Sequence, residues 1–471
     1  MLKLIIEKEL REILGSTKFV VTFSVCATLI LIAFYVGGRS YDVSRSDYEA
    51  AVAENVKQMA GLTDWGRIDH RVFLEPQPLG ALVTGIANDI GRTTEVRTRG
   101  ELNSENSRFN EDPLFAVFRF LDLEFIFGIV LSLFAILFGY DAINGEKERG
   151  TLRLSFANAV PRDKYILGKL AGSFLALSVP LLIPILIGCL LLPILGVPME
   201  SGDWQRLAMI IACGYLYLGV FLALSIFISA MTEHSSSSFL LLLVVWIIAV
   251  LIVPRTAVLV SGRAVDVPTM DEINFEKNRI SDQLRREDDS KLRAYWSENP
   301  QTGTETRDQM MTRFRNYWSE LADAREQEVR ALSARLSEDR RNRERVQQRI
   351  ALGISRISPT SVFSLAATDL AGTSLELQQQ YQDQVSQYRD DYTRFIEEKT
   401  GGSGGFWFSG GSTDEAEEEP IDPYELPVFE FDAPTAATLV SKSLLDLGLL
   451  TIFNIVFFVG AFVAFLRYDV R

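Results

Sequence analysis

The sequence predicts an all-α membrane protein in which six helices cross the bilayer. Six apolar runs have no charge in their middle and approach the length of about 20 residues that a helix needs to span the hydrocarbon layer. Between these runs the chain is dense in Arg, Asp, Glu and Gln. Because the bilayer core holds no water, the backbone of each run must satisfy its own hydrogen bonds, as a helix does. The predicted spans are 19–37, 121–142, 170–197, 207–231, 239–260 and 444–466.

Basic residues in the short loops predict the orientation of the chain. They gather in the N-terminal stretch 1–18, in the loop 143–169 and in the tail 467–471. Short loops rich in Lys and Arg stay in the cytoplasm, so both termini are expected there. The long segments 38–120 and 261–438 then lie outside, since long segments cross largely regardless of charge. The first run lacks a clear small-residue pattern for signal-peptide cleavage, so it is expected to remain in the protein as the first span.

The N-terminal stretch predicts an amphipathic helix at the cytoplasmic interface of the membrane. Its apolar residues recur at helical spacing, which places them on one face. They are Leu2, Ile5, Ile6, Leu10 and Ile13.

The loop between the second and third spans contains a short charged helix that ends at a glycine. We expect it to be a rigid handle whose alternating charges pair with a soluble partner and whose movement tilts both attached spans. The simpler interpretation is an ordinary turn whose basic residues set the orientation. The residues of the handle are Glu146, Lys147, Glu148, Arg149, Gly150, Thr151 and Leu152.

The first outer segment, 38–120, starts with a helical pattern and continues as a polar loop. We expect it to rest on the second outer segment or to serve as a docking surface. The second, 261–438, is predicted to be a mainly helical domain. Two amphipathic helices in it are expected to pair as a hairpin, with stripes at Met310, Phe314, Tyr317, Leu321, Val329, Leu332 and Leu336, and at Leu377, Tyr381, Val385, Tyr388, Tyr392 and Phe395.

Two further features lie in the second outer segment. Ser358 followed by Pro359 predicts the start of a helix, and Gly372 predicts its end. A glycine-rich loop displays Phe406-Trp407-Phe408, which either inserts into the membrane interface or a partner, or folds into its own domain. The long charged helix before Ser358 has a dense run at Glu338–Arg345, interpreted as a solvated end.

Several classes of function find no support in the sequence. Histidines, cysteines and carboxylates show no pattern of catalytic or metal-binding sites, so none is predicted. No phosphate-cradling Gly-x-x-x-x-Gly-Lys-Ser/Thr loop is present, so ATP and Mg²⁺ are expected on a separate chain. The net charge of −14 argues against nucleic acid as a partner. Asp122 and Glu124 lie near the outer end of the second span and are candidates for lining a pathway.

The run Glu146–Leu152 resembles the motif of ABC-2-type permeases, the membrane subunits of a class of ABC exporters. The six-span layout, the N-terminal helix, Pro161-Arg162 and Gly168-Lys169 are also similar. One branch, with a large outer domain between the fifth and sixth spans, shares further short motifs, namely Val253-Pro254-Arg255, Ser358-Pro359, Leu370-Ala371-Gly372-Thr373 and Leu426-Pro427. The resemblance implies a pair of permeases with two ATPase subunits, which contact the handle and the N-terminal helix.

The sequence therefore predicts a permease subunit of an ABC exporter in a prokaryotic plasma (inner) membrane, coupled to a separate ATPase subunit. One alternative is a mechanical subunit that relays ATPase motion to an outer partner without transporting a substrate. Another is a sensor or an ion-gradient carrier, which the scarcity of charges at mid-membrane disfavours.

Overall fold

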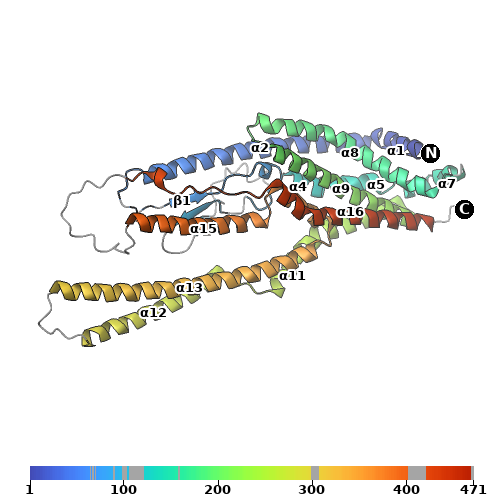
Figure 1. Cartoon of the computed structure of the whole chain (residues 1–471). Helices are drawn as coiled ribbons and strands as arrows, with labels where there is room; N and C mark the ends of the chain where they lie inside the picture. Colours follow the sequence, from blue (N-terminus) through green and yellow to red (C-terminus); the bar gives the residue numbers. More distant parts are fainter. Residues whose placement is uncertain are drawn as a thin grey trace. The chain divides into compact units, whose positions relative to one another are not determined.

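The computed structural model describes residues 1–63, 65, 68, 70–87, 91–97, 103–105, 121–157, 160–298, 307–400 and 421–467. Six helical stretches are long and apolar enough to cross a membrane, and each contains or overlaps one predicted span (Figure 1). The prediction of an all-α membrane protein with six spans is confirmed. The stretches are Thr17–Met59, Leu123–Glu148, Arg162–Ile194, Ser201–Met231, Ser235–Ala264 and Ala436–Leu466.

Most of the described chain is helical. The helices are α1 (Leu2–Leu14), α2 (Thr17–Met59), η2 (Pro78–Ala81), α4 (Leu123–Phe125), η4 (Ile126–Leu131), α5 (Ser132–Gly139), α6 (Asn144–Glu148), α7 (Thr151–Ala157), α8 (Arg162–Ile194), α9 (Ser201–Met231), α10 (Ser235–Ile247), η5 (Ile248–Ile252), α11 (Val253–Ala264), α12 (Met270–Glu298), α13 (Arg307–Ser355), α14 (Pro359–Ala371), α15 (Leu375–Thr400), η6 (Pro423–Glu425) and α16 (Ala436–Leu466). Three short strands complete the elements: β1 (His70–Phe73), β2 (Thr93–Val96) and β3 (Asn103–Glu105).

The chain forms two compact units. Unit 1 comprises Met1–Leu251 and Ser358–Arg471, and unit 2 comprises Ile252–Ile357. The predicted helical domain 261–438 is therefore divided: its first part belongs to unit 2, while its second part folds with the membrane-spanning helices.

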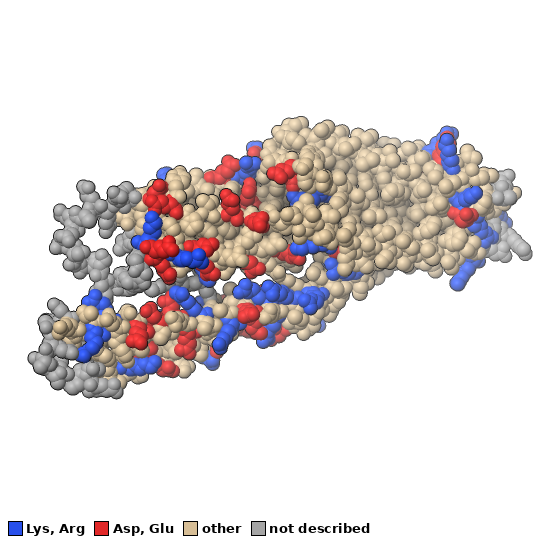
Figure 2. Space-filling view, in the orientation of Figure 1, with Lys and Arg blue, Asp and Glu red and all other residues tan. Residues whose placement is uncertain are grey.

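Helix α9 lies at the centre of the membrane core of unit 1. It packs against α16, α14 and α5, and its residues Tyr217, Leu218 and Phe221 have no exposed surface. A helix that is apolar on all sides is buried on all sides. The neighbouring helices instead expose large apolar side chains, such as Leu186 of α8 and Ile455 of α16. Figure 2 shows this surface of unit 1 as an uncharged belt between two charged ends, as a lipid-facing surface requires.

Helix α14 has the start and end that the sequence predicts, although it was expected in the outer domain. Ser358 Oγ accepts hydrogen bonds from the backbone N–H groups of Thr360 and Ser361, and Gly372 ends the helix with φ of 73°. Its residues Val362 and Phe363 belong to the same apolar core as the spans. The structure therefore places this segment in the membrane core of unit 1, because its apolar face is matched by α9 and α16.

Two spans contain π-helical segments, η4 in the second and η5 in the fifth. A π-turn frees a carbonyl oxygen from the regular α-helical pattern. Gly128 O, in η4, accepts from Tyr217 Oη at 2.8 Å and from Ser132 Oγ at 2.7 Å. Ala249 O, in η5, accepts from Ser358 Oγ at 2.6 Å. Since Tyr217 Oη also lies 2.9 Å from Thr360 Oγ1, the first turn of α14 is linked to both segments.

A small lobe of unit 1 joins the C-terminal end of α2 to a three-stranded antiparallel sheet and α15. The strand order is β1-β2-β3, with His70 opposite Val96 and Thr93 opposite Glu105. The apolar face of α15 packs on this sheet, through Tyr381, Tyr388, Tyr392 and other residues of one core. The sequence did not predict the sheet, whose strands have only three or four residues.

Unit 2 is an antiparallel pair of long helices, α12 and α13, with α11 packed on the last turns of α13. The predicted pairing of the two amphipathic stripes is wrong, because α13 packs on α12 and α11 while α15 packs in unit 1. The two stripes have the same helical period, and periodicity does not identify the partner of a helix. The Phe406-Trp407-Phe408 loop lies outside the described residues.

Candidate coupling site

Helix α1 lies along the first turns of α8, where two glycines allow a close approach. A Cβ atom added to Gly168 would lie 2.7 Å from Ile5 Cγ2, and one added to Gly172 would lie 2.6 Å from Glu9 Cβ. Ile5 and Glu9 are four residues apart on α1, as are Gly168 and Gly172 on α8. One face of α1 therefore packs directly on the glycine backbone of α8. Small residues allow helices to pack closely in this way. The predicted amphipathic helix therefore packs on the protein itself.

A buried ion cluster fastens α1 and α6 to α8. Lys169 Nζ contacts a carboxylate oxygen of Glu9 and lies 2.8 Å from Glu146 Oε1. Glu146 also accepts from Lys8 Nζ at 2.7 Å and from Tyr165 Oη at 2.6 Å. The side chains of Lys169 and Glu146 are 3% and 2% exposed. Removing one partner of such a pair leaves a buried charge uncompensated, so loss of a single member is expected to destabilise the packing of the three helices.

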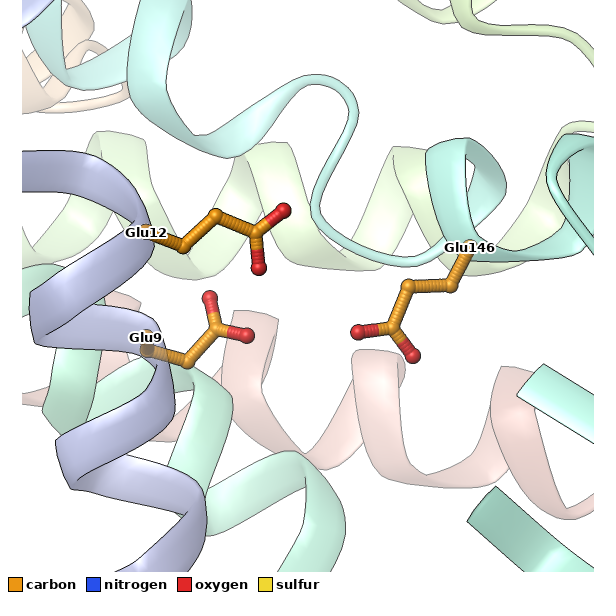
Figure 3. Close-up of side chains that lie close together, drawn as sticks. All are labelled: Glu9, Glu12 and Glu146. Carbon is orange, nitrogen blue, oxygen red and sulfur yellow. The ribbon is translucent and has the colours of Figure 1, made fainter. Parts of the chain in front are cut away.

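Three carboxylates converge at this cluster (Figure 3). Oxygens of Glu9, Glu12 and Glu146 lie within 4.8 Å of one another. Burial raises the pKa of Glu9 above its ordinary value, although the ammonium of Lys169 beside it favours the ionised form. Lys169 binds both Glu9 and Glu146, and Arg149 lies 3.4 Å from Glu12. Basic side chains thus compensate the carboxylates, and the arrangement is an ion-pair network.

The next residue of the handle, Lys147, binds the end of α9. Its Nζ donates to the carbonyl oxygens of Ala230, at 2.8 Å, and Thr232, at 3.2 Å. A cation is favourable at a helix C-terminus, where carbonyl oxygens lack partners within the helix. Lys147 therefore joins α6 to α9.

Glu148 binds the start of α10. Its carboxylate accepts from the backbone N–H of Ser235 at 2.8 Å and from the hydroxyl of Ser235 at 2.9 Å. An anion at a helix N-terminus satisfies N–H groups that have no partner within the helix. The five residues of α6 thus connect α1, α8, α9 and α10 at one end of unit 1.

Comparison with known proteins gives the family. A sequence model described as "ABC-2 family transporter protein" matches residues 4–470. The chain belongs to the ABC-2 transporter family. The "Probable ABC transporter permease protein NosY" of Stutzerimonas stutzeri is 35% identical over 127 residues, which are 26% of this chain and 45% of that protein. The matched part is therefore less than half of that relative. The resemblance found in the sequence is confirmed, and the chain is a multi-pass membrane subunit.

The remaining handle residues of the ABC-2 subunit have distinct surroundings. Arg149 is 60% exposed, while its Nε donates to Gly145 O at 3.0 Å. Gly150 ends α6 with φ of 73°, a conformation that favours glycine. Thr151 Oγ1 donates to Glu146 O at 3.4 Å, and Leu152 is buried in a core with residues of α8, α9 and α16. Of the predicted charges, Arg149 is thus the one most open to a partner.

Sequence reasoning assigned no role in the cluster to five of its members: Lys8, Glu9, Glu12, Tyr165 and Lys169. Two signals were available. Glu9 interrupts the apolar face of the N-terminal helix, four residues from Ile5 and Ile13, and Lys169 lies within a Gly-x-x-x-Gly spacing at the start of an apolar span. A charged residue at such a position needs a partner of opposite charge. The pairing itself depends on the tertiary fold.

Asp122 and Glu124, the predicted pathway residues, lie elsewhere in the ABC-2 subunit. Asp122 accepts from the backbone N–H of Phe125 at 2.8 Å and of Thr84 at 3.3 Å, which caps α4. Glu124 accepts a hydrogen bond from Ser364 of α14. The structure brings Glu124 against α14 and gives Asp122 a capping contact; a role in transport stays a prediction.

Proposed function

We propose that the chain is the permease subunit of an ABC exporter, driven by a separate ATPase that binds ATP and Mg²⁺. Two copies of the chain would assemble with two ATPase subunits. The observation that supports this proposal is the buried ion cluster with its neighbouring contacts, in which α6 connects four helices through Glu146, Lys147 and Glu148. A force applied to α1 or α6 is thereby transmitted to three spans at once.

The exposed face of α1 and the end of α6 form the proposed ATPase-binding surface. Lys8, Arg11 and Glu12 expose 52%, 83% and 44% of their side chains, and Arg149 exposes 60%. Both signs of charge are present, which suits a partner with a complementary pattern and sets its orientation. The buried members hold this surface rigidly, so that closure of the ATPases would tilt α8, α9 and α10.

Purification with the ATPase tests the proposal. The substitutions Arg11→Glu and Arg149→Glu reverse exposed charges of the proposed surface and leave Lys169 and its carboxylates in place. We expect each to weaken ATPase binding and to lower the ATPase activity that the permease stimulates. A matched control is Arg39→Glu, since Arg39 pairs with Asp42 three residues away in α2. Unchanged binding and stimulation in both surface variants would reject this surface.

A second candidate function is mechanical, namely relay of ATPase motion to an outer protein partner without transport. The observation in its favour is unit 2, a compact insertion of 252–357 between α10 and α14. A helical hairpin of this length is suited to reaching a partner. Replacement of the hairpin separates the two functions, as developed below.

A further inference from the structure

The end of unit 2 where the chain enters and leaves differs from the rest of its surface. We call this part the root: α11 (Val253–Ala264) and residues 345–357 at the end of α13. The two parts pack together, since Gln347 Nε2 donates to Val265 O at 3.3 Å, and Ala257 and Ser261 are buried. The root contains no Asp or Glu.

Four exposed arginines of the root have no ion-pair or hydrogen-bond partner among the described residues: Arg255, Arg263, Arg345 and Arg349. Farther along the hairpin, acidic residues are interspersed with the arginines. There Arg325 lies 2.7 Å from Asp288, Arg330 lies 2.5 Å from Glu326, and Arg340 lies 2.7 Å from Glu344. The positive charge of the root is therefore not compensated within unit 2 by ion pairs of this kind.

Large apolar side chains lie between these arginines. Leu259 is 67% exposed and stands one helical turn from both Arg255 and Arg263. Val258 and Val260 are 65% and 50% exposed. On the chain's return, Val346 and Ile357 are 47% and 68% exposed. A surface that combines exposed aliphatic groups with unpaired guanidinium groups matches the boundary between acyl chains and phosphates.

The fifth helical stretch is longer than the hydrocarbon layer is thick, so α11 is expected to extend beyond that layer. This stretch, Ser235–Ala264, has 30 residues, which at 1.5 Å per residue is about 45 Å. The hydrocarbon layer is about 30 Å thick. Glu148 holds the Ser235 end next to the buried ion cluster. The excess of about 15 Å therefore falls at the other end, within α11.

We propose that the root is a phospholipid-binding surface, whose arginines bind the phosphates of the leaflet nearest unit 2 while its aliphatic side chains enter the acyl boundary. Guanidinium groups bind phosphate oxygens in a bidentate manner. The bound leaflet then holds both ends of the inserted hairpin at a fixed depth. This proposal rests on the membrane span and is independent of the proposed ATPase coupling.

Hydrogen exchange of the full chain in nanodiscs tests this proposal. Peptides covering 253–264 and 345–357 are compared in phosphatidylcholine alone and in phosphatidylcholine with phosphatidylglycerol. We expect slower exchange in the anionic membrane. Changing all four arginines to glutamine (R255Q, R263Q, R345Q and R349Q) should remove that difference. Each substitution is expected to lower the affinity for the anionic membrane by about fivefold. A control with equal charge change, R279Q, R285Q, R293Q and R330Q, should keep it.

Four results would overturn the proposal. Equal exchange in both membranes, or a lipid effect retained in the root variant, would remove the role of the arginines. Protection by inorganic phosphate in detergent would identify a site for a free anion instead. Protection in detergent that rises with protein concentration would identify a second copy of the chain as the occupant.

Discussion

At the scale of single residues, Lys169 is the buried cation on which the packing of α1, α6 and α8 depends. Its ammonium is nearly inaccessible to solvent and binds Glu9 and Glu146, which are themselves buried. We expect Lys169→Met to destabilise the protein by about 3–5 kcal/mol, because it leaves the buried carboxylate of Glu9 uncompensated and removes one of the two cations that contact Glu146. Arg149→Gln removes an exposed pair with Glu12 and should cost less than about 1 kcal/mol. Thermal unfolding in detergent compares the two variants, and equal losses would contradict the network.

His70 gives the lobe of unit 1 that contains the sheet and α15 a pH-dependent stability. Burial lowers the pKa of His70 from 6.5 to about 4, and its Nε2 lies 2.7 Å from Tyr388 Oη. As the pH falls below 6.5, the unfolded chain binds a proton before the folded chain does. The free energy of unfolding should therefore fall between pH 6.5 and 4, by about 3 kcal/mol at most.

Chemical denaturation of the wild type and of His70→Phe at several pH values checks this expectation. The substitution removes the titrating group and keeps an aromatic ring beside Tyr392, on which His70 stacks. The difference between the two proteins should be constant above pH 6.5 and should shift in favour of the variant on acidification. Parallel pH profiles would refute the role of His70.

At the scale of elements, the glycine strip of α8 controls how closely α1 packs. We expect Gly172→Ala to destabilise the protein by about 1–3 kcal/mol, since its Cβ would overlap Glu9 in a filled interface. Displacement of α1 should also increase the rate at which trypsin cleaves the chain after Lys8. Gly448→Ala is the matched control within a span, because no atom lies within 4 Å of the added Cβ. Similar effects of both substitutions would show that close packing of α1 is unimportant.

The elements also show what the sequence can predict. The six spans follow from apolar length, and the limits of α14 follow from Ser358, Pro359 and Gly372, because these signals are local. The partner of α15 and the burial of α14 depend on which apolar faces meet, and many faces are equivalent in sequence. The handle was identified by its motif, while its inward contacts with Ala230 and Ser235 were not, since they join segments more than 80 residues apart.

At the scale of the whole molecule, unit 2 is an insertion that unit 1 does not need for its own cores. The three apolar cores of unit 1 contain no residue of 252–357. We expect replacement of 253–356 by a short Gly-Ser linker to leave the thermal unfolding of unit 1 nearly unchanged, because the bond from Ser358 to Ala249 keeps the two ends close. Loss of the unit 1 transition would contradict this independence.

The same variant separates the proposed functions. If the subunit is an exporter, the shortened chain should still bind the ATPase and move substrate. If it relays motion to an outer protein, the shortened chain should keep ATPase binding and lose that protein on purification. Loss of ATPase binding in a folded variant would contradict both expectations.

The π-helical segments allow a span to change without unfolding. A π-turn contains one residue more than an α-turn, so converting it to α-helix releases one residue and rotates the adjoining helix by about 100°. In the second span, the adjoining helix leads directly to α6. Such a conversion breaks the hydrogen bond from Tyr217 to Gly128 O. The span therefore has two discrete orientations about its axis, one with the π-turn and one without it. The hydrogen bonds of Tyr217 to Gly128 and to Thr360, in the first turn of α14, stabilise the orientation that contains the π-turn.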